Sequence, residues 1–284
     1  VGVRGGVCAL TKCDLATPDI RELAIEELRE VLAGTALEGA PIVPVSAHTG
    51  EGMEALVAAL TARAVAPRDA SGPPVLPIDR VFVRKGFGVV VTGTLVSGTL
   101  REGDRVACGP MGADGRLQEA RVRGMQVHGA AVTEARAGNR VAINLAGVER
   151  AEVERGQWVL RPDEVALTRA FDAEVTLLPQ TRRAIPRRAR LELAVGATRC
   201  LASVSLLQDD PLEPGRRALA RVTTDRPVAV RVDERMVLRG PPSLAGVGST
   251  VGGLVAVRPV SERIRRRAVA RERVAVSVGQ HRHH

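Results

Sequence analysis

The sequence predicts a multi-domain protein in which a short α/β segment is followed by two antiparallel β-barrels. Residues 1–66 alternate apolar runs with helical apolar spacing, residues 67–77 are rich in Pro, Gly and Ser, and residues 78–260 contain short β-branched runs separated by glycine turns. The chain has 284 residues, 45% of them hydrophobic, which is enough for two or three domains with buried cores.

The first segment, residues 1–66, is predicted to contain two strands that alternate with two helices. The strands are expected at residues 7–10 and 42–45, and the second helix at residues 53–64. The first helix has Thr17 as its N-cap and Pro18 at its first position. An apolar stripe follows at helical spacing: Ile20, Leu23, Ala24, Leu28, Val31 and Leu32. This pattern is typical of the end of a doubly wound sheet.

The rest of the chain is predicted to contain a linker, two β domains and a tail. Residues 67–77 have the composition of a linker. Residues 78–162 and 163–260 each contain short strands at regular spacing, as in an antiparallel barrel. Residues 261–284 form an arginine-rich end.

Composition narrows the range of functions. The formal net charge of +9 favours a polyanionic partner such as RNA, and the aromatic content of 1% argues against base stacking, so phosphate and sugar contacts are expected. No apolar run is long enough to span a membrane. The four cysteines are scattered, which predicts reduced thiols and no metal site. We expect a cytoplasmic monomer without a membrane partner.

Two loops carry a pattern that reads guanine. In "TKCD", Thr11 and Lys12 precede Asp14, whose carboxylate can accept the N1 and N2 hydrogens of guanine while the lysine stem covers the base. In "VSAHTG", Ala47 offers its backbone N–H to guanine O6, and Ser46 braces the turn. Each motif follows a predicted strand, and their order supports a guanine-binding site.

These motifs and the β domains resemble translational GTPases. Within that superfamily, "LPIDRVFVRKGFGVVVTGTLVSGTLREGD" resembles the second domain of the SelB family of selenocysteine-specific elongation factors. The segments "LLQDDPLEPGRRALARVTTDRPVAV" and "STVGGLVAVRP" resemble its third domain. The resemblance covers residues 1–260 and implies the C-terminal remnant of a P-loop GTPase α/β domain followed by two barrels like domains 2 and 3 of elongation factor Tu.

The resemblance also implies which parts of the family lie outside this sequence. The family's phosphate-binding loop and switch regions are expected before residue 1, and its winged-helix domains after the second barrel. We therefore expect a partial version of the family. GTP is the implied cofactor, with Mg²⁺ held through the N-terminal part, and we expect neither tight nucleotide binding nor hydrolysis by this chain alone. No catalytic residue is expected in it.

The family's amino-acid pocket lies on the second domain. Carried over by motif, Asp79 and Arg80 of "PIDRVF" and Arg140 of "AGNRVAINL" match that pocket, and Gln126 and His128 of "RGMQVHG" are further polar candidates. A selenol is ionised at neutral pH, so paired guanidinium groups would favour it over the uncharged serine precursor. Whether Asp79 orients Arg80 or faces the ligand is left open by the sequence.

The implied function is delivery of selenocysteinyl-tRNA to the ribosome at recoded UGA codons in the GTP form. A messenger hairpin would be read through domains outside this sequence. Two alternatives remain: a general aminoacyl-tRNA carrier of the same superfamily, and a nucleotide-independent RNA-binding β protein.

Overall fold

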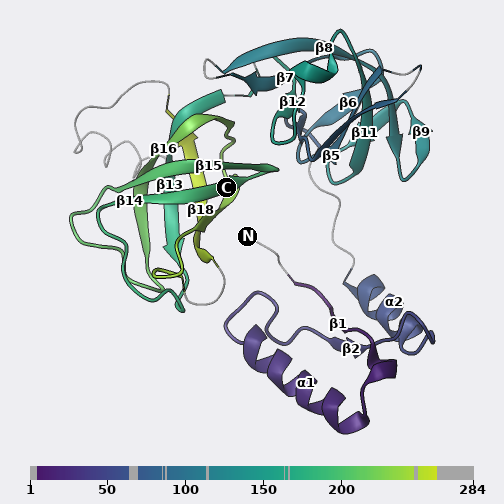
Figure 1. Ribbon diagram of the computed structural model, residues 1–284, viewed down its shortest axis with the longest axis vertical. Helices are drawn as coiled ribbons and strands as arrows, with labels where there is room; N and C mark the ends of the chain where they lie inside the picture. The colour runs from purple at the N-terminus through teal and green to yellow at the C-terminus, as the bar shows by residue number, and fades with distance from the viewer. Residues whose placement is uncertain are drawn as a thin grey trace. The chain divides into compact units, whose positions relative to one another are not determined.

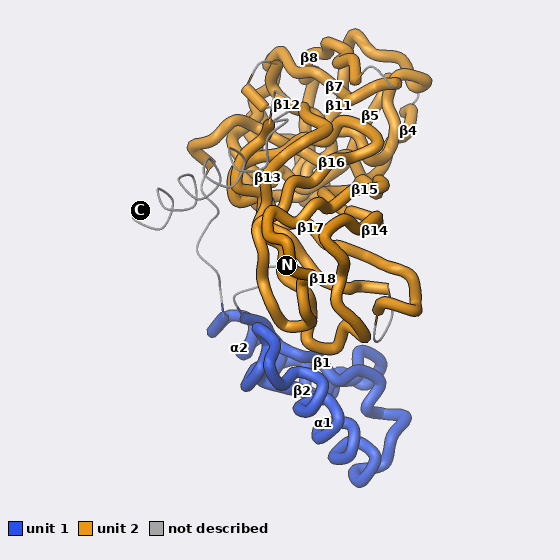
Figure 2. Tube along the Cα trace, turned by 90° about the vertical axis from the view of Figure 1, so that its left-hand side faces the viewer, with its two compact units in different colours: residues 1–66 blue, residues 67–284 orange. Residues whose placement is uncertain are grey.

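The computed structural model describes residues 5–63, 70–84, 86, 88–112, 115–162, 164–165, 167–245 and 249–260. It separates into two compact units, residues 1–66 and residues 67–284 (Figure 2). The arginine-rich end predicted at residues 261–284 lies outside the described residues. No helix within these ranges is long and apolar enough to cross a membrane. The predicted succession of a short α/β segment and two β domains is confirmed (Figure 1).

The first unit contains two parallel strands, each followed by a helix. The elements in chain order are β1 (Cys8–Leu10), a 3₁₀ turn (Cys13–Leu15), α1 (Pro18–Leu32), β2 (Ile42–Pro44) and α2 (Met53–Ala62). Strand β1 pairs with β2 in parallel. Helix α1 begins as predicted, because Thr17 is its N-cap and Pro18 its first residue.

The apolar stripe of α1 is only partly covered: Ala24, Leu28 and Leu32 are half-buried, and the other three residues are exposed. No residue of α1 is buried, and the exposed fractions of Ile20, Leu23 and Val31 are 57%, 61% and 72%. Parallel sheets are usually covered by helices on both faces, but only two strands are present in the described part of this unit. Two strands provide too little surface to bury the stripe.

The first β domain is built on an eight-stranded sheet in the order β3-β12-β7-β8-β11-β5-β4, with β9 paired to β8, and a two-stranded sheet β10-β6. The strands are β3 (Val75–Pro77), β4 (Arg80–Arg84), β5 (Gly88–Thr94), β6 (Thr99–Arg101), β7 (Arg105–Met111), β8 (Arg116–Val127), β9 (Ala130–Val132), β10 (Glu134–Arg136), β11 (Arg140–Ala146) and β12 (Trp158–Leu160). A second 3₁₀ turn covers Arg150–Glu152.

Strand β3 corrects the predicted linker, because Val75–Pro77 belongs to the first β domain and not to a connection. Leu76 is fully buried, and β3 pairs with β12 in antiparallel register. β3 is the end strand of the sheet path, where proline is tolerated because one side of the strand needs no ladder hydrogen bond. The Pro-rich composition therefore concealed an edge strand.

The strands of this domain alternate between a buried and a more exposed face. On β11, Val141, Ile143 and Leu145 enter a core that also contains Val91 of β5. The residues between them, including Ala142 and Asn144, point to the other face. The outer face of β5 and β11 thus carries Thr92, Arg140 and Asn144.

The second β domain is a closed barrel in the order β13-β16-β15-β14-β17-β18. Its strands are β13 (Leu167–Leu177), β14 (Arg188–Val195), β15 (Thr198–Leu206), β16 (Arg217–Ala229), β17 (Arg235–Arg239) and β18 (Thr250–Pro259). Asp172 of β13 is fully buried and forms ion pairs with its cross-strand neighbours Arg221 of β16 and Arg258 of β18. This triad compensates the buried carboxylate.

Candidate functional site

The two predicted guanine-reading loops lie at the same edge of the parallel pair β1–β2. The loop after β1 contains Lys12, whose backbone is left-handed with φ 61°, and Asp14, which lies in the 3₁₀ turn. The loop after β2 contains Ser46 and Ala47. Because parallel strands end at a common edge, the fold brings together two motifs that are about thirty residues apart.

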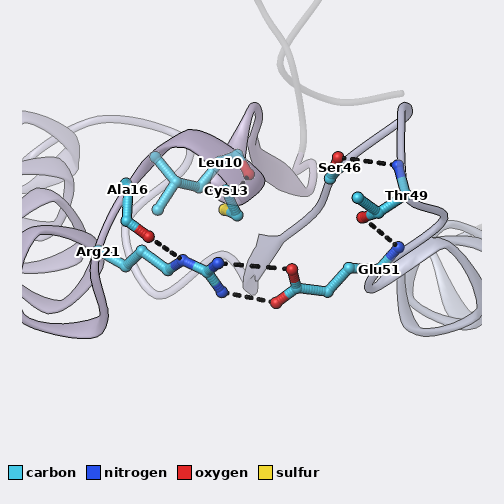
Figure 3. A network of polar contacts seen from close by, with 7 residues as sticks. All are labelled: Leu10, Cys13, Ala16, Arg21, Ser46, Thr49 and Glu51. Carbon is cyan, nitrogen blue, oxygen red and sulfur yellow. Dashed lines mark hydrogen bonds and ion pairs between the residues drawn. The ribbon is translucent and has the colours of Figure 1, made fainter.

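The loop after β2 is fixed by its own backbone and side chains (Figure 3). Ser46 is fully buried; its N–H donates to the carbonyl of Glu51 at 2.9 Å, and its Oγ accepts from the N–H of Thr49 at 3.2 Å. Gly52 closes the loop with φ 71°, and a Cβ on it would lie 2.0 Å from the carbonyl oxygen of Pro44. Only glycine fits this close return.

The two loops are also joined directly to each other. The N–H of Val45 donates to Leu10 O at 2.8 Å, and the N–H of Cys13 donates to Val45 O at 3.2 Å. Within the described ranges, the Asp14 carboxylate and the Ala47 N–H have no hydrogen-bond partner, and both residues are exposed. An unpaired acceptor and an unpaired donor at one sheet edge match the hydrogen-bonding groups of guanine.

A second polar cluster lies on the outer face of the first β domain. Arg140 at the start of β11 donates to both carboxylate oxygens of Asp79, with distances of 2.6 Å from Nη1 to Oδ2 and 2.9 Å from Nη2 to Oδ1. Thr92 of β5 donates its hydroxyl to Asp79 Oδ1 at 2.8 Å and lies 3.4 Å from Arg140 Nη2. The pair is therefore bidentate and braced by a hydroxyl.

Arg80 is the remaining cation of this cluster. Burial raises the pKa of Asp79, but hydrogen bonds from Arg140 and Thr92 and the charges of Arg140 and Arg80 outweigh it and lower the pKa below its usual value. Asp79 therefore stays ionised, and its hydrogen bond and charge raise the pKa of Arg140. Arg80 is exposed and has no ion pair among the residues that the structure describes.

Strand register places Gln126 in the same row across the sheet, two strands away from Thr92. Arg80 faces Thr92 across β4–β5, Thr92 faces Ala142, and Ala142 faces Gln126 of β8. Gln126 also lines a cavity of about 320 Å³ with Phe82 and Asn144, among other residues. The side-chain oxygen of Asn144 is buried there and has no hydrogen-bond partner in the described structure.

His128 is not brought into contact with the cluster. It lies in the tight turn between β8 and β9, with φ 51°, and its side chain is exposed. No hydrogen bond or ion pair joins it to Asp79 or Arg140 within the described ranges. Of the five residues predicted for this site, Asp79 and Arg140 are in direct contact and the charge of Arg80 acts on Asp79, whereas neither Gln126 nor His128 has a hydrogen bond or ion pair to them among the described residues.

Three features of the sites were not predicted from the sequence. Thr92 hydrogen-bonds to Asp79 beside Arg140, and Asn144 carries an unpaired oxygen in the adjacent cavity. In addition, a nine-residue stretch of the second β domain contains five arginines: Arg182, Arg183, Arg187, Arg188 and Arg190. The arginine cluster is visible in the sequence as a charge run. The roles of Thr92 and Asn144 depend on strand register, which the sequence does not specify.

Metal ligation has no support in the described part of the chain. No group of three or more His, Cys, Asp or Glu side chains there could hold a metal ion. All four cysteines are free, and Cys13, Cys108 and Cys200 are buried.

Comparisons with known proteins agree with these folds. The family model for elongation factor Tu domain 2 matches residues 88–160. A selenocysteine-specific elongation factor from Desulfomicrobium baculatum is 40% identical over 269 residues, which cover 94% of this chain and 41% of that protein. One from Mus musculus is 31% identical over 205 residues, covering 67% of this chain and 34% of that protein. The chain thus spans about two fifths or less of these relatives.

Solved structures give the same result. The crystal structure of a bacterial selenocysteine-specific elongation factor, EF-Sec, matches with a TM-score of 0.78 and 25% identity over 98% of this chain and 44% of that one. The α/β segment with its two loops and the two β domains define the chain as part of a translational GTPase. More particularly, the chain belongs to the family of selenocysteine-specific elongation factors.

Proposed function

We propose that this chain supplies the guanine-reading loops and the selenocysteine-recognising β domain of an elongation factor that delivers selenocysteinyl-tRNA to the ribosome. The observation that carries the proposal is the cluster in which Asp79 holds Arg140 while Arg80 remains without an ion pair. Selenocysteine is proposed as the amino acid because it is the one in the names of the similar proteins. A messenger hairpin and the ribosome are further partners of the complete factor.

The charge of the cluster favours an anionic amino acid. Two arginines and one ionised carboxylate leave a net charge of one positive unit (2 − 1) on this face. A selenolate would be attracted to it, whereas the hydroxyl of serine carries no charge to attract. Since Asp79 is occupied by Arg140, Arg80 is the side chain proposed to contact the selenolate, and Arg140 and Asp79 are proposed to shape its surroundings.

Guanine recognition is proposed for the loops of the first unit. The Asp14 carboxylate would accept from N1 and N2 of the base, and Ala47 N–H would donate to O6; Thr11, Lys12 and Ser46 frame these groups. Magnesium and phosphate chemistry would be supplied by the phosphate-binding loop of the family. Because phosphate contacts provide much of a nucleotide's affinity, the chain alone is proposed to bind GTP or GDP weakly.

The tRNA body is proposed to contact the second β domain. Of the five arginines between residues 182 and 190, only Arg187 forms an ion pair among the described residues, with Asp209 at 3.4 Å. The other four are exposed. Unpaired exposed arginines suit phosphate contacts, which position a nucleic acid without reading its sequence.

Protection of the aminoacyl ester tests the proposal. Selenocysteinyl-tRNA and seryl-tRNA, prepared on the same tRNA, would be incubated with the chain while spontaneous hydrolysis of the ester is followed. The chain should slow hydrolysis of the selenocysteinyl ester more than that of the seryl ester, because only the selenolate gains from Arg80. Equal protection of both esters would indicate a general carrier, and binding of uncharged tRNA alone would indicate an RNA-binding protein without an amino-acid pocket.

A further inference from the structure

An arginine of α1 connects the two guanine-reading loops (Figure 3). The Nε of Arg21 donates to the carbonyl of Ala16, which ends the first loop, at 3.1 Å. The terminal nitrogens of the same guanidinium contact both carboxylate oxygens of Glu51 in the second loop, at 2.6 Å and 3.5 Å. One side chain therefore spans two loops that are thirty residues apart in the sequence.

Glu51 is itself part of the second loop's hydrogen-bonded frame. Its carbonyl accepts from Ser46 N–H at 2.9 Å, and its N–H lies 3.4 Å from Thr49 Oγ1. The residue next to Ser46 is Ala47. The backbone of Glu51 thus holds the turn that presents Ala47 N–H, while its side chain holds the first loop through Arg21.

The other direct connection between the loops lies nearer the strands. The N–H of Cys13 donates to the carbonyl of Val45, a residue that is 4% exposed at the end of β2. Residues 47–51 of the second loop are exposed, and the Arg21–Glu51 pair is a further connection between this part of the loop and the first loop.

We propose that Arg21 and Glu51 are positioning residues that set the distance between Ala47 N–H and the Asp14 carboxylate, and so determine recognition of guanine O6. This inference rests on the proposed guanine-reading function. Neither side chain needs to touch the base, because the pair acts through the two loops. The second loop retains the bonds of Ser46 without the pair, so a variant should keep its fold and change its base discrimination.

Three nucleoside monophosphates probe the two halves of the base reader. GMP carries O6, the N1 hydrogen and the N2 amino group, and IMP lacks only the amino group, so IMP reports on the N2 contact of Asp14. 2-Aminopurine riboside monophosphate lacks O6 together with the N1 hydrogen, so it reports on the Ala47 contact and the N1 contact of Asp14 jointly. Loss of Ala47 positioning should reduce the preference for GMP over the 2-aminopurine nucleotide. The preference for GMP over IMP depends on Asp14, which lies in the first loop, and should change little.

The experiment is a titration of the full chain at millimolar nucleotide, followed by NMR shifts of its backbone amides, for the wild type and the variants Glu51→Gln and Arg21→Ala. The preference for GMP over 2-aminopurine riboside monophosphate should fall about three- to fivefold, the upper range for a partly exposed ion pair. The preference for GMP over IMP should stay within about twofold. The double variant should lose no more than Arg21→Ala alone, because the pair acts as a unit.

Glu26→Gln is the matched control, since Glu26 pairs with Arg29 on the exposed surface of the same helix and touches neither loop. Unchanged discrimination in Glu51→Gln and Arg21→Ala, or an equal loss of all three nucleotides, would overturn the positioning role. Failure of the wild type to bind GMP at all would instead overturn the proposed guanine-reading function, and this inference with it.

Discussion

Asp79, which directly precedes β4, and Arg140, the first residue of β11, form a bidentate ion pair with both distances under 3 Å, although 61 residues separate them in the sequence. The sequence left open whether this carboxylate orients Arg80. In the structure Asp79 pairs with Arg140, and Arg80 has no ion pair among the described residues. The charge of Arg80 is therefore available to another partner. Arg140 therefore neutralises a carboxylate that would otherwise repel an anion at this face.

The Asp79–Arg140 pair should contribute a pH-dependent share of stability. Since the pKa of Asp79 is lowered in the folded state, the contribution is fully present above the unfolded pKa, for which 3.8 is the reference, and is lost as the pH falls through the folded pKa. Arg140 is half-exposed, so Asp79→Asn should cost only about 0.5–1 kcal/mol at pH 7. Urea unfolding followed through Trp158, the single tryptophan, would measure this.

The control for that measurement is Glu119→Gln. Glu119 pairs with Arg105 at 3.2 Å on the exposed surface of the same domain. Glu119→Gln should leave the free energy of unfolding unchanged both at pH 7 and at a pH below the folded pKa of Asp79. A cost of Asp79→Asn that persists well below the folded pKa would show that the carboxylate's charge is not what stabilises this face.

The cysteines should differ in reactivity. Burial raises the pKa of Cys108 to about 12, and burial together with the charge of Asp225 raises the pKa of Cys200 to about 12. Thiolates are the reactive species, so both should resist iodoacetamide at pH 8 in the folded chain and react after unfolding. Cys8 is only partly buried and should react first. Mass spectrometry of labelled peptides would give the order, and early labelling of Cys108 would contradict the described core.

The stability of the closed barrel should depend mainly on the side chains that its strands direct into the core. Leu193 of β14 is fully buried, and Leu201 of the neighbouring β15 is 62% exposed. Leu193→Ala should destabilise the barrel by about 2–5 kcal/mol because it leaves a cavity. Leu201→Ala, the same chemical change on the outer face, should stay within about 0.5 kcal/mol. Denaturant unfolding followed by circular dichroism distinguishes the two variants. An equal loss of unfolding free energy in both would contradict the assignment of Leu193 to the core and Leu201 to the outer face.

The Asp14 carboxylate should control base preference in the loop after β1. Asp14→Asn replaces an acceptor with a donor, which suits the C2 carbonyl of xanthine better than the amino group of guanine. GMP binding should weaken relative to XMP, by roughly tenfold for one charge-assisted hydrogen bond. Competition between the two nucleotides on the full chain measures this, and an unchanged ratio would remove Asp14 from the site.

Much of the fold could be predicted from local patterns. The β-branched runs indicated the strands of both β domains, and Thr17 with Pro18 marked the start of α1. Strand β3 was missed because Pro77 and the two prolines before the strand resemble a linker, while the place of β3 at the sheet edge makes Pro77 tolerable. The spacing of α1 identified its apolar face but not what covers that face, because covering depends on neighbouring elements.

The candidate sites were predicted unevenly. The loops proposed to read guanine contain short motifs, so their residues could be named directly, whereas their connection through Arg21 and Glu51 required the structure. Likewise, a resemblance named Asp79 and Arg140 as pocket residues but did not show that they pair. Side-chain partners from distant strands depend on register, and composition or spacing does not encode it.

The most direct test of the account is the effect of Arg80→Ala on selectivity between selenocysteinyl-tRNA and seryl-tRNA. Two unit charges about 4 Å apart at an effective dielectric near 20 attract by roughly 4 kcal/mol, and desolvation offsets part of this. We predict a loss of about 1–3 kcal/mol for selenocysteinyl-tRNA, or roughly five- to a hundredfold in affinity, with seryl-tRNA nearly unchanged. Arg105→Ala, on an exposed arginine of the same domain, should change neither. Equal losses for both aminoacyl-tRNAs in Arg80→Ala would show that Arg80 contacts the tRNA backbone and would contradict the selenocysteine pocket.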